Sequence, residues 1–291
     1  MRPMPITGRN FFNDLNPGIR EGRGVGHFND GDVQYAAMDA SALMIIVRRT
    51  RGELFERFVA RYSREEHLKV VINGNYYDVE LDGKTDAYFG HDPVEALYSL
   101  PEGHVVSEGH LVDGSSRPNH FFVAREPINY PNPSDAYTFG QGDPPRESDA
   151  ALGGLGPLII NRLKFGIGNL YHSGVPAGAP HTGEPGPRHR PFLAQRNNNT
   201  YVDFAAMGDR RGKVVLAIAR AAQKILVLVQ PEDTPTGISL DNLRDKLASV
   251  GVDDAVFMDG GNSALLVINN RFHVHMDDDK NELCTIGLGF K

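Results

Sequence analysis

The sequence predicts an α+β protein whose mixed, largely antiparallel β-sheets pack with a few helices and carry long Gly/Pro-rich loops around the site. Three observations predict this class. Apolar runs of strand length outnumber segments with helical spacing, and several successive runs are separated by hairpin-type turns. The 32 glycines and 19 prolines indicate many turns and long connections. Strands linked in this way are typical of antiparallel or mixed sheets.

In the first half of the chain, one helix stands out among predicted strands. Leu54, Phe55, Phe58 and Val59 have the spacing of one helical face, which predicts a helix over 52–62. Short apolar runs bounded by turn residues predict strands at 42–47, 67–74 and 120–124, and a hairpin with a Glu-Gly turn over 103–114.

The second half contains the clearest helix, over 239–251. Ser239 suits the N-cap, and Gly251 suits the position after the last helical turn. The remaining predicted elements are a glycine turn and strand at 153–161, a hairpin over 200–219, strands at 224–230, 255–258 and 264–268, and an Asn-Asn turn of type I′ leading into 271–275.

Two long segments are predicted to be loops, 126–150 and 166–191, because proline, glycine and polar residues dominate them. Loops of this length inside a compact domain are usually functional or disordered. They are interpreted either as the rim of an active site or as plain disorder. We divide the chain into an N-terminal extension, 1–39, and one domain, 40–291.

Composition excludes some partners and leaves others open. The net charge of −7 gives no basic face for phosphate backbones or anionic lipid, so we expect neither nucleic-acid nor membrane partners. Cys284 is the single cysteine, which excludes an internal disulfide and a thiolate zinc cage. No apolar run approaches the ~20 residues of a membrane span, and no signal peptide is visible, so we expect a cytoplasmic protein. The oligomeric state is not indicated.

A glycine elbow follows the apolar run that ends at Met258. It reads Asp259, Gly260, Gly261, Asn262 and Ser263, and a second apolar run begins immediately after it. Adjacent glycines allow a sharp turn, and their N–H groups can form a nest for an anion. Short polar side chains suit sugar hydroxyls or phosphate oxygens. The alternative is a wide hairpin with a glycine bulge and a solvated aspartate.

A second polar turn, "NGNYYD", follows the strand predicted at 67–74. Asn73 and Asn75 flank Gly74, which permits an unusual backbone angle, and Asp78 closes the turn. The alternative is an ordinary β-turn whose tyrosines pack on the core.

Taken together, three segments resemble the phosphodiester glycosidase family: "VVINGNYYD" (70–78), "GLGPLIIN" (154–161) and "GISLDNLRDKLASVGVDDAVFMDGGNSALLV" (237–267). The resemblance covers roughly residues 40 to 291. It implies hydrolysis of a sugar-1-phosphodiester to a free sugar and a phosphomonoester, without a cofactor. Asn75 and Asn262 stand where the family usually has glycine. A family arginine has no secure counterpart here, with Arg196, Arg210 and Arg211 as its possible substitutes.

The resemblance also implies roles for particular residues. Asp259 would stabilise the reacting carbon, act as nucleophile or serve as base, helped by Asn73 and Asp78. The "RHR" run and Arg196 are the candidates for an anion clamp, or alternatively part of a solvated loop. The predicted substrate-binding residues are Asn75, Gly156, Arg188, His189, Arg190, Arg196, Gly260, Gly261, Asn262 and Ser263. The expected partner is a small-molecule or glycan phosphodiester.

Two other functions stay open at this point. A catalytically silent module on the same scaffold could bind a glycan or nucleotide sugar. A metal-dependent hydrolase is a weaker alternative, since a period of two would place His273 and His275 on one strand face before three aspartates. That pattern more often marks a polar strand face with an acidic turn, so we predict no metal.

Overall fold

The computed structural model describes residues 24–49, 54–74, 77–81, 97–101, 103–118, 120–127, 129–165, 211–235, 237–276 and 286–291. Strands dominate these segments, joined by two α-helices and two short 3-10 turns. Every strand pairing among them is antiparallel. The predicted α+β class with largely antiparallel sheets is therefore confirmed.

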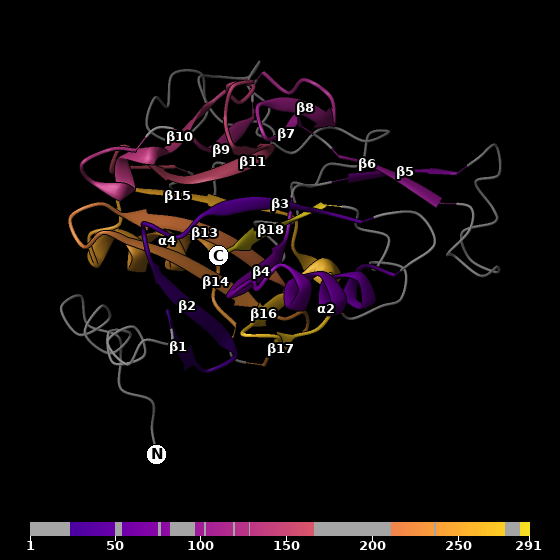
Figure 1. The fold of residues 1–291 in the computed structure, drawn as a ribbon. Coiled ribbons are helices and arrows are strands. Elements are labelled where there is room, and N and C mark those ends of the chain that lie inside the picture. Colours follow the sequence, from indigo (N-terminus) through magenta and orange to yellow (C-terminus); the bar gives the residue numbers. More distant parts are fainter. Residues whose placement is uncertain are drawn as a thin grey trace, which may run out of the picture.

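The largest sheet has eleven strands. Its main path runs β1 (Val25–Asp30), β2 (Val33–Asp39), β14 (Lys224–Gln230), β13 (Lys213–Ala219), β15 (Asp254–Phe257), β11 (Ala150–Ile160), β7 (Val105–Ser107) and β8 (His110–Asp113). Three strands lie off this path: β9 (Phe121–Arg125), β10 (Tyr137–Gln141) and β12 (Leu163–Lys164). Figure 1 shows β7 to β11 above the rest of the sheet.

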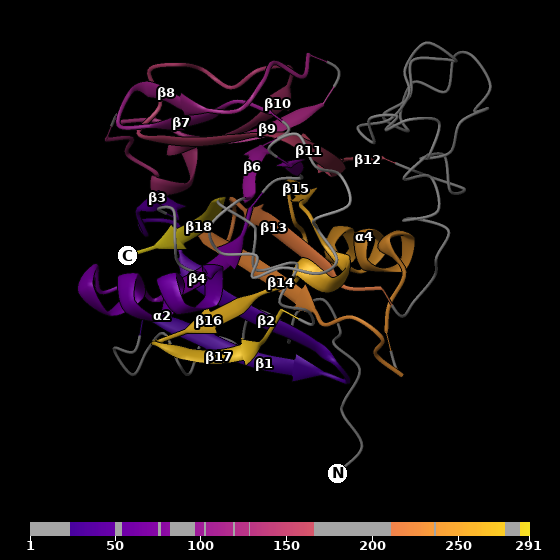
Figure 2. The same cartoon turned by 90° about the vertical axis from the view of Figure 1, so that its right-hand side faces the viewer.

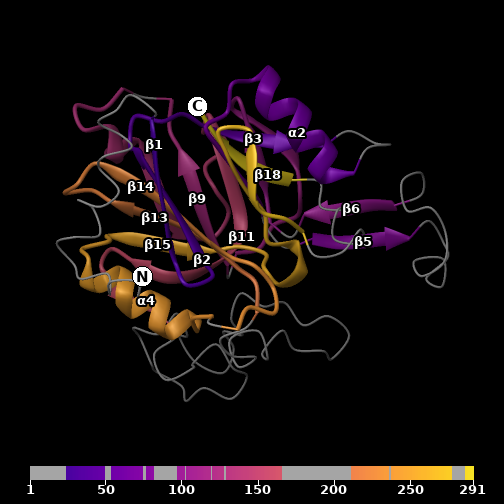
Figure 3. The same ribbon diagram turned by 90° about the horizontal axis from the view of Figure 1, so that it is seen from below.

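A second sheet has five strands, in the order β17 (Arg271–Val274), β16 (Leu266–Ile268), β4 (Val70–Asn73), β18 (Ile286–Phe290) and β3 (Met44–Arg48). A separate pair, β5 (Tyr77–Leu81) and β6 (Leu97–Pro101), projects to one side in Figures 1 and 3.

The alternation of β4 shows how the layers stack. Val70 and Ile72 belong to the main core, which they share with the large sheet, whereas Val71 belongs to a second cluster under helix α2 (Phe55–Glu65). Successive side chains of a strand point to opposite faces, so the five-stranded sheet has the large sheet on one side and α2 on the other. Figure 3 shows α2 and helix α4 (Leu240–Ser249) on opposite flanks of the molecule.

Both predicted helices are confirmed, with shifted ends. In α4 the Ser239 side chain accepts a hydrogen bond from the Asn242 N–H at 3.2 Å, as an N-cap does. Gly251 follows the helix with a φ of +84°. Leu240, Leu243 and Leu247 are buried in the main core, and Figure 2 shows α4 flanking β13. Neither described helix has the length and apolar character that crossing a membrane requires.

Two predictions about irregular segments need correction. The segment 25–39, which we placed in an N-terminal extension, forms the β1–β2 hairpin, and β2 pairs with β14 along its length. The predicted loop 126–150 contains a 3-10 turn (Pro133–Ala136) and strand β10, which pairs with β9. Its five prolines argued against a strand, although the alternation around Thr138 buries Tyr137 and Phe139.

Other predictions are confirmed in part. The glycines at 153–156 lie within β11 and do not form a separate turn before it. In the hairpin predicted over 200–219, the second arm is β13, and the first lies outside the described residues, as does the loop 166–191. The Asn269-Asn270 turn has positive φ at both residues, as type I′ requires.

Candidate functional site

The glycine elbow is a crossing between two sheets and is not a hairpin. Strand β15, before it, lies in the eleven-stranded sheet, and β16, after it, lies in the five-stranded sheet. Residues 261–263 form a 3-10 turn, and Gly261 has a φ of +58°, a region that favours glycine. The wide-hairpin alternative is therefore wrong. A two-residue turn would keep both runs in one sheet, whereas five residues lead the chain across to the other.

The elbow is held by a residue from the other polar turn. Asn73 donates from its side-chain nitrogen to the Asp259 carbonyl at 2.8 Å, and its side-chain oxygen accepts from the Leu265 N–H at 2.9 Å. The Asp259 N–H in turn donates to the Gly74 carbonyl at 3.2 Å. Two segments separated by 186 residues of sequence thus meet at one point.

Asn73 is better described as a positioning residue than as a group that touches substrate. Its side chain is fully buried, and both ends of its amide bind backbone on either side of the elbow. A buried amide whose donor and acceptor are satisfied by main chain fixes the path of that main chain. Asp259 itself is half-buried.

The start of β13 supports the elbow from the opposite side. The Gly261 N–H donates to the Gly212 carbonyl at 2.8 Å, and the Met258 N–H donates to the Val214 carbonyl at 2.9 Å. A Cβ on Gly212 would lie 2.1 Å from the Gly261 carbonyl oxygen. Only glycine fits at Gly212 while the elbow keeps this position.

Between these two hydrogen bonds, the backbone of Lys213 faces the segment of Asp259 and Gly260. Lys213 is the first residue of β13 and is buried, and its ammonium donates to the Arg211 carbonyl at 2.7 Å. Sequence reasoning missed this residue. The available signal was a lysine at the start of an apolar strand, "KVVLAIA", because a buried lysine requires partners.

A buried carboxylate fixes the turn before Lys213. The Glu232 side chain is 3% exposed; it accepts from the Gly212 N–H and pairs with the guanidinium of Arg211. Arg211 keeps about a third of its side chain exposed. The turn thus brings two cationic residues to the flank of the elbow.

The predicted anion nest is only partly available. The N–H of Gly261 is used by Gly212, and the Ser263 N–H donates to the Gly260 carbonyl at 3.1 Å. Gly156 also has a packing role. It lies opposite Phe257 in the β11–β15 pairing, and a Cβ there would lie 2.1 Å from that ring.

The remaining predicted site residues are placed only in part. Asp78 lies on β5 opposite Leu100 of β6, and Asn262 lies in the 3-10 turn; the side chains of both are outside the description. Ser263 is buried at the end of that turn. Five other predicted substrate-binding residues lie outside the described part of the chain: Asn75, Arg188, His189, Arg190 and Arg196.

The two candidate metal-binding histidines do not converge. Strand β17 ends at Val274, so His275 lies beyond the strand and the two-residue alternation of side chains does not apply to it. The His275 ring stacks on Phe272 and contacts Glu56 at 3.1 Å, whereas the His273 ring packs against His27. The expectation of a shared face is wrong, and the described residues contain no group of three or more potential metal ligands.

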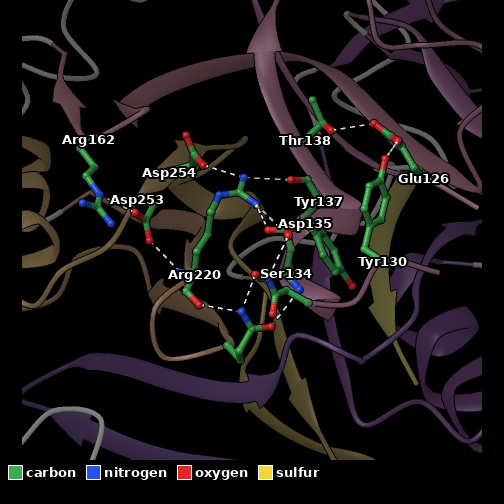
Figure 4. A network of polar contacts seen from close by, with 12 residues as sticks. Glu126, Tyr130, Ser134, Asp135, Tyr137, Thr138, Arg162, Arg220, Asp253 and Asp254 are labelled. Carbon is green, nitrogen blue, oxygen red and sulfur yellow. Dashed lines mark hydrogen bonds and ion pairs between the residues drawn. The ribbon is translucent and has the colours of Figure 1, made fainter. Parts of the chain in front are cut away.

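A separate polar network lies at the start of β15 (Figure 4). Arg220 donates to the Asp254 carboxylate at 2.9 Å and to the carbonyls of Ser134 and Tyr137 at 2.7 and 2.9 Å. Asp253 accepts from the Arg220 N–H and from the Arg162 guanidinium. These residues hold strand ends together on the side away from the elbow, so we assign them to the fold.

The meeting of the two polar turns can be compared with known proteins. A family model described as phosphodiester glycosidase matches residues 66–290, which is more than half of the chain and includes both turns. The chain belongs to the phosphodiester glycosidase family. No curated protein matches this chain significantly.

Solved structures share the fold. One is the catalytic domain of zebrafish N-acetylglucosamine-1-phosphodiester alpha-N-acetylglucosaminidase, auto-inhibited by its pro-peptide. It is 13% identical with a TM-score of 0.56, over 91% of this chain and 80% of that one. Another is a candidate exported protein from Burkholderia pseudomallei K96243. It is 13% identical with a TM-score of 0.54, over 89% of this chain and 73% of that one. At these identities the likeness concerns the fold alone.

Proposed function

We propose that this phosphodiester glycosidase family member hydrolyses a sugar-1-phosphodiester and releases a free sugar and a phosphomonoester. The observation that carries the proposal is the hydrogen bonding between Asn73 and Asp259, supported by the Asp259–Gly74 bond. These contacts bring the two polar turns of the family pattern to one place. The name of the zebrafish enzyme, which is similar in fold, describes the same class of bond.

The chemistry suits a site with one well-placed carboxylate. An ordinary glycosidase pairs two carboxyl groups because its alcohol leaving group must be protonated as the bond breaks. A phosphomonoester has a second pKa of about 6, so it leaves near neutral pH with little protonation. The protein then needs chiefly to stabilise positive charge at the anomeric carbon and to hold the phosphate.

We assign the first task to Asp259. Its backbone is fixed by Asn73 and Gly74 on one side, and its neighbour Gly261 is fixed by Gly212 on the other. A carboxylate on such a braced segment is pre-organised, which is the main source of electrostatic stabilisation of a transition state. Asp78, on β5, is proposed to orient the sugar or the attacking water.

The second task is proposed for cationic residues near the elbow. Lys213 lies between Gly212 and Val214, whose carbonyls accept hydrogen bonds from the two sides of Asp259 and Gly260, and Arg211 is two residues before it. Guanidinium and ammonium groups bind phosphate oxygens, arginine with the greater geometric specificity. The "RHR" run and Arg196 remain proposed contributors to the same clamp.

The test is turnover by the Asp259→Asn variant. The full chain is assayed against a panel of sugar-1-phosphodiesters, with separate detection of free sugar and phosphomonoester. We expect the variant to lose at least ~10²–10³ in kcat while binding is kept, as is typical when one stabilising group is removed. Asp245→Asn, at an exposed carboxylate of α4, is the matched control. Full activity in Asp259→Asn would remove this residue from the mechanism.

A catalytically silent binding module is the second candidate. It is favoured by Asn75 and Asn262 at glycine positions of the family pattern and by the occupied Gly261 N–H. The same assay separates the two functions. Saturable binding of a sugar phosphodiester without release of either product, in the unmodified chain, would establish the silent module. The cytoplasmic location stays a prediction, and one similar structure comes from a candidate exported protein.

A further inference from the structure

Two histidines from edge strands of different sheets face each other. His27 lies on β1, at one end of the large sheet, and His273 lies on β17, at one end of the five-stranded sheet. Their ring centroids are 4.2 Å apart, with the ring planes at 60°. Figures 1 and 2 show β1 and β17 side by side at the lower end of the molecule.

Each ring retains a nitrogen for a ligand. His27 contacts the Gln34 side-chain oxygen through Nε2 at 2.9 Å, so this nitrogen carries the proton and Nδ1 carries a lone pair. His273 makes no hydrogen bond to another described residue through its ring.

We propose that His27 and His273 form a binding site for one divalent transition-metal ion of the Zn²⁺, Cu²⁺ or Ni²⁺ class. Neutral imidazole is a preferred ligand of these ions, whereas Ca²⁺ and Mg²⁺ prefer oxygen. Two metal–nitrogen bonds of about 2.0–2.1 Å place the nitrogens roughly 3 Å apart. Rings whose centroids lie 4.2 Å apart need small changes in χ1 as well as χ2 to present one nitrogen each to a common ion, and χ2 is broad for histidine.

The bound ion would link the N-terminal hairpin to the C-terminal part of the chain. Both histidines are exposed, so water completes the coordination shell, and the ion has no part in the proposed hydrolysis. One neighbouring group opposes binding: the exposed Arg271 adds positive charge beside His273. The site therefore rests on two imidazoles and has an affinity limited by a nearby cation.

The experiment uses the full chain without a histidine tag. Cu²⁺ and Zn²⁺ are titrated in separate calorimetric runs, and the Cu²⁺ complex is examined by electron paramagnetic resonance. We expect one equivalent that binds more tightly than any other and whose Cu²⁺ spectrum shows coupling to two nitrogens. His27→Ala and His273→Ala should each weaken binding at least tenfold. Arg271→Gln should tighten it, because a like charge is removed.

His275→Ala is the matched control. It removes an exposed histidine of the same segment that contacts Glu56 and stacks on Phe272, so binding should not change. Circular dichroism checks that each variant is folded, which we expect because the substituted side chains are exposed. The proposal is overturned if the unmodified chain binds neither ion, if His27→Ala binds as the unmodified chain does, or if His275→Ala alone removes binding.

Discussion

The Asn73 side chain donates a 2.8 Å hydrogen bond to the backbone carbonyl of Asp259 and accepts one of 2.9 Å from the Leu265 N–H. One buried amide thus binds the chain on both sides of the elbow. The elbow is also the point at which the chain passes from the large sheet to the five-stranded sheet. The position of the proposed catalytic carboxylate therefore depends on a fully buried residue whose side chain binds backbone.

We expect Asn73→Ala to reduce both stability and turnover. The substitution leaves the Asp259 carbonyl and the Leu265 N–H without the Asn73 side chain as their partner. Each unsatisfied group costs about 1–3 kcal/mol in the free energy of unfolding, and because the chain relaxes partially we expect a total loss of about 2–4 kcal/mol. Urea unfolding measures the loss. Among the folded molecules, kcat should fall more than KM rises, because the carboxylate is displaced from its stabilising position.

Asn29→Ala is the control for this prediction. Asn29 is exposed on the edge strand β1, so the free energy of unfolding should change by no more than about 0.5 kcal/mol, and kcat should stay the same. Unchanged unfolding in Asn73→Ala would contradict the bracing role.

Gly212→Ala tests the close approach of β13 to the elbow. The added Cβ would lie 2.1 Å from the Gly261 carbonyl oxygen, so one of the two backbones must move. We expect a loss of about 1–3 kcal/mol in the free energy of unfolding, typical of overpacking, and a fall of about 10²-fold in kcat from the shifted elbow. Thermal unfolding and turnover at a temperature below the transition measure the two effects.

Gly251→Ala is the comparison for Gly212→Ala. Gly251 has a φ of +84° but open space around its Cβ position, so only backbone strain is added. This variant should lose about 1–2 kcal/mol and keep its kcat. An equal loss of kcat in both variants would show that the effect of Gly212→Ala is one of general stability.

The polar network of Figure 4 should affect folding without affecting catalysis. Asp254 is 2% exposed and holds the Arg220 guanidinium and the Asn161 N–H. We expect Asp254→Ala to cost about 2–4 kcal/mol, since it leaves a half-buried cation and a backbone donor without their partner. Below the unfolding transition, kcat should equal that of the unmodified chain.

The control for Asp254→Ala is Asp39→Ala. Asp39 pairs with Lys224 at the surface, where its side chain is 52% exposed, and such pairs contribute less than about 1 kcal/mol. If Asp254→Ala lowered kcat in folded protein, the network would extend to the site.

Asp143 provides a pH test. Partial burial raises the pKa of its carboxyl, but hydrogen bonds from Ser116 and the Arg117 N–H, with the charges of His104 and Arg146, outweigh burial and hold the pKa below its ordinary value. A carboxyl with a lowered pKa stabilises the fold above its ordinary pKa, and that contribution is lost as pH falls through the folded value. Asp143→Asn should therefore lower the unfolding temperature at pH 6 and differ progressively less towards pH 2.

The matched measurement for Asp143 uses Ser116→Ala. Removal of the Ser116 hydroxyl should move the pKa of folded Asp143 upward, towards its unfolded value, so the acid-induced loss of stability from this carboxyl should be smaller and should be complete at higher pH than in the unmodified chain. A pH profile identical to that of the unmodified chain would mean that the Ser116–Asp143 bond does not act in solution.

The sequence by itself determined the local elements and the family. Periodicity located both helices, and the apolar runs located β3, β4, β9, β14 and the β7–β8 hairpin, because side-chain spacing of 3.6 or 2 directly reflects which face is buried. The order of the two polar turns indicated the phosphodiester glycosidase family, which the family model confirms. Segments dense in proline or lying before residue 40 were misjudged, since their strands are specified by partners far along the chain.

Only the tertiary structure decided what each polar residue does. Asn73 and Gly261 are residue types that often bind ligands. In the structure, however, the Asn73 side chain and the Gly261 N–H form hydrogen bonds with the backbone of distant segments. Lys213 belongs to no recognisable motif, and only the hydrogen bonds of its neighbours Gly212 and Val214 to Gly261 and Met258 bring its segment to the elbow. The reason is physical: periodicity reports burial of a residue relative to its own element, whereas hydrogen-bond partners 186 or 192 residues away are set by how the sheets pack.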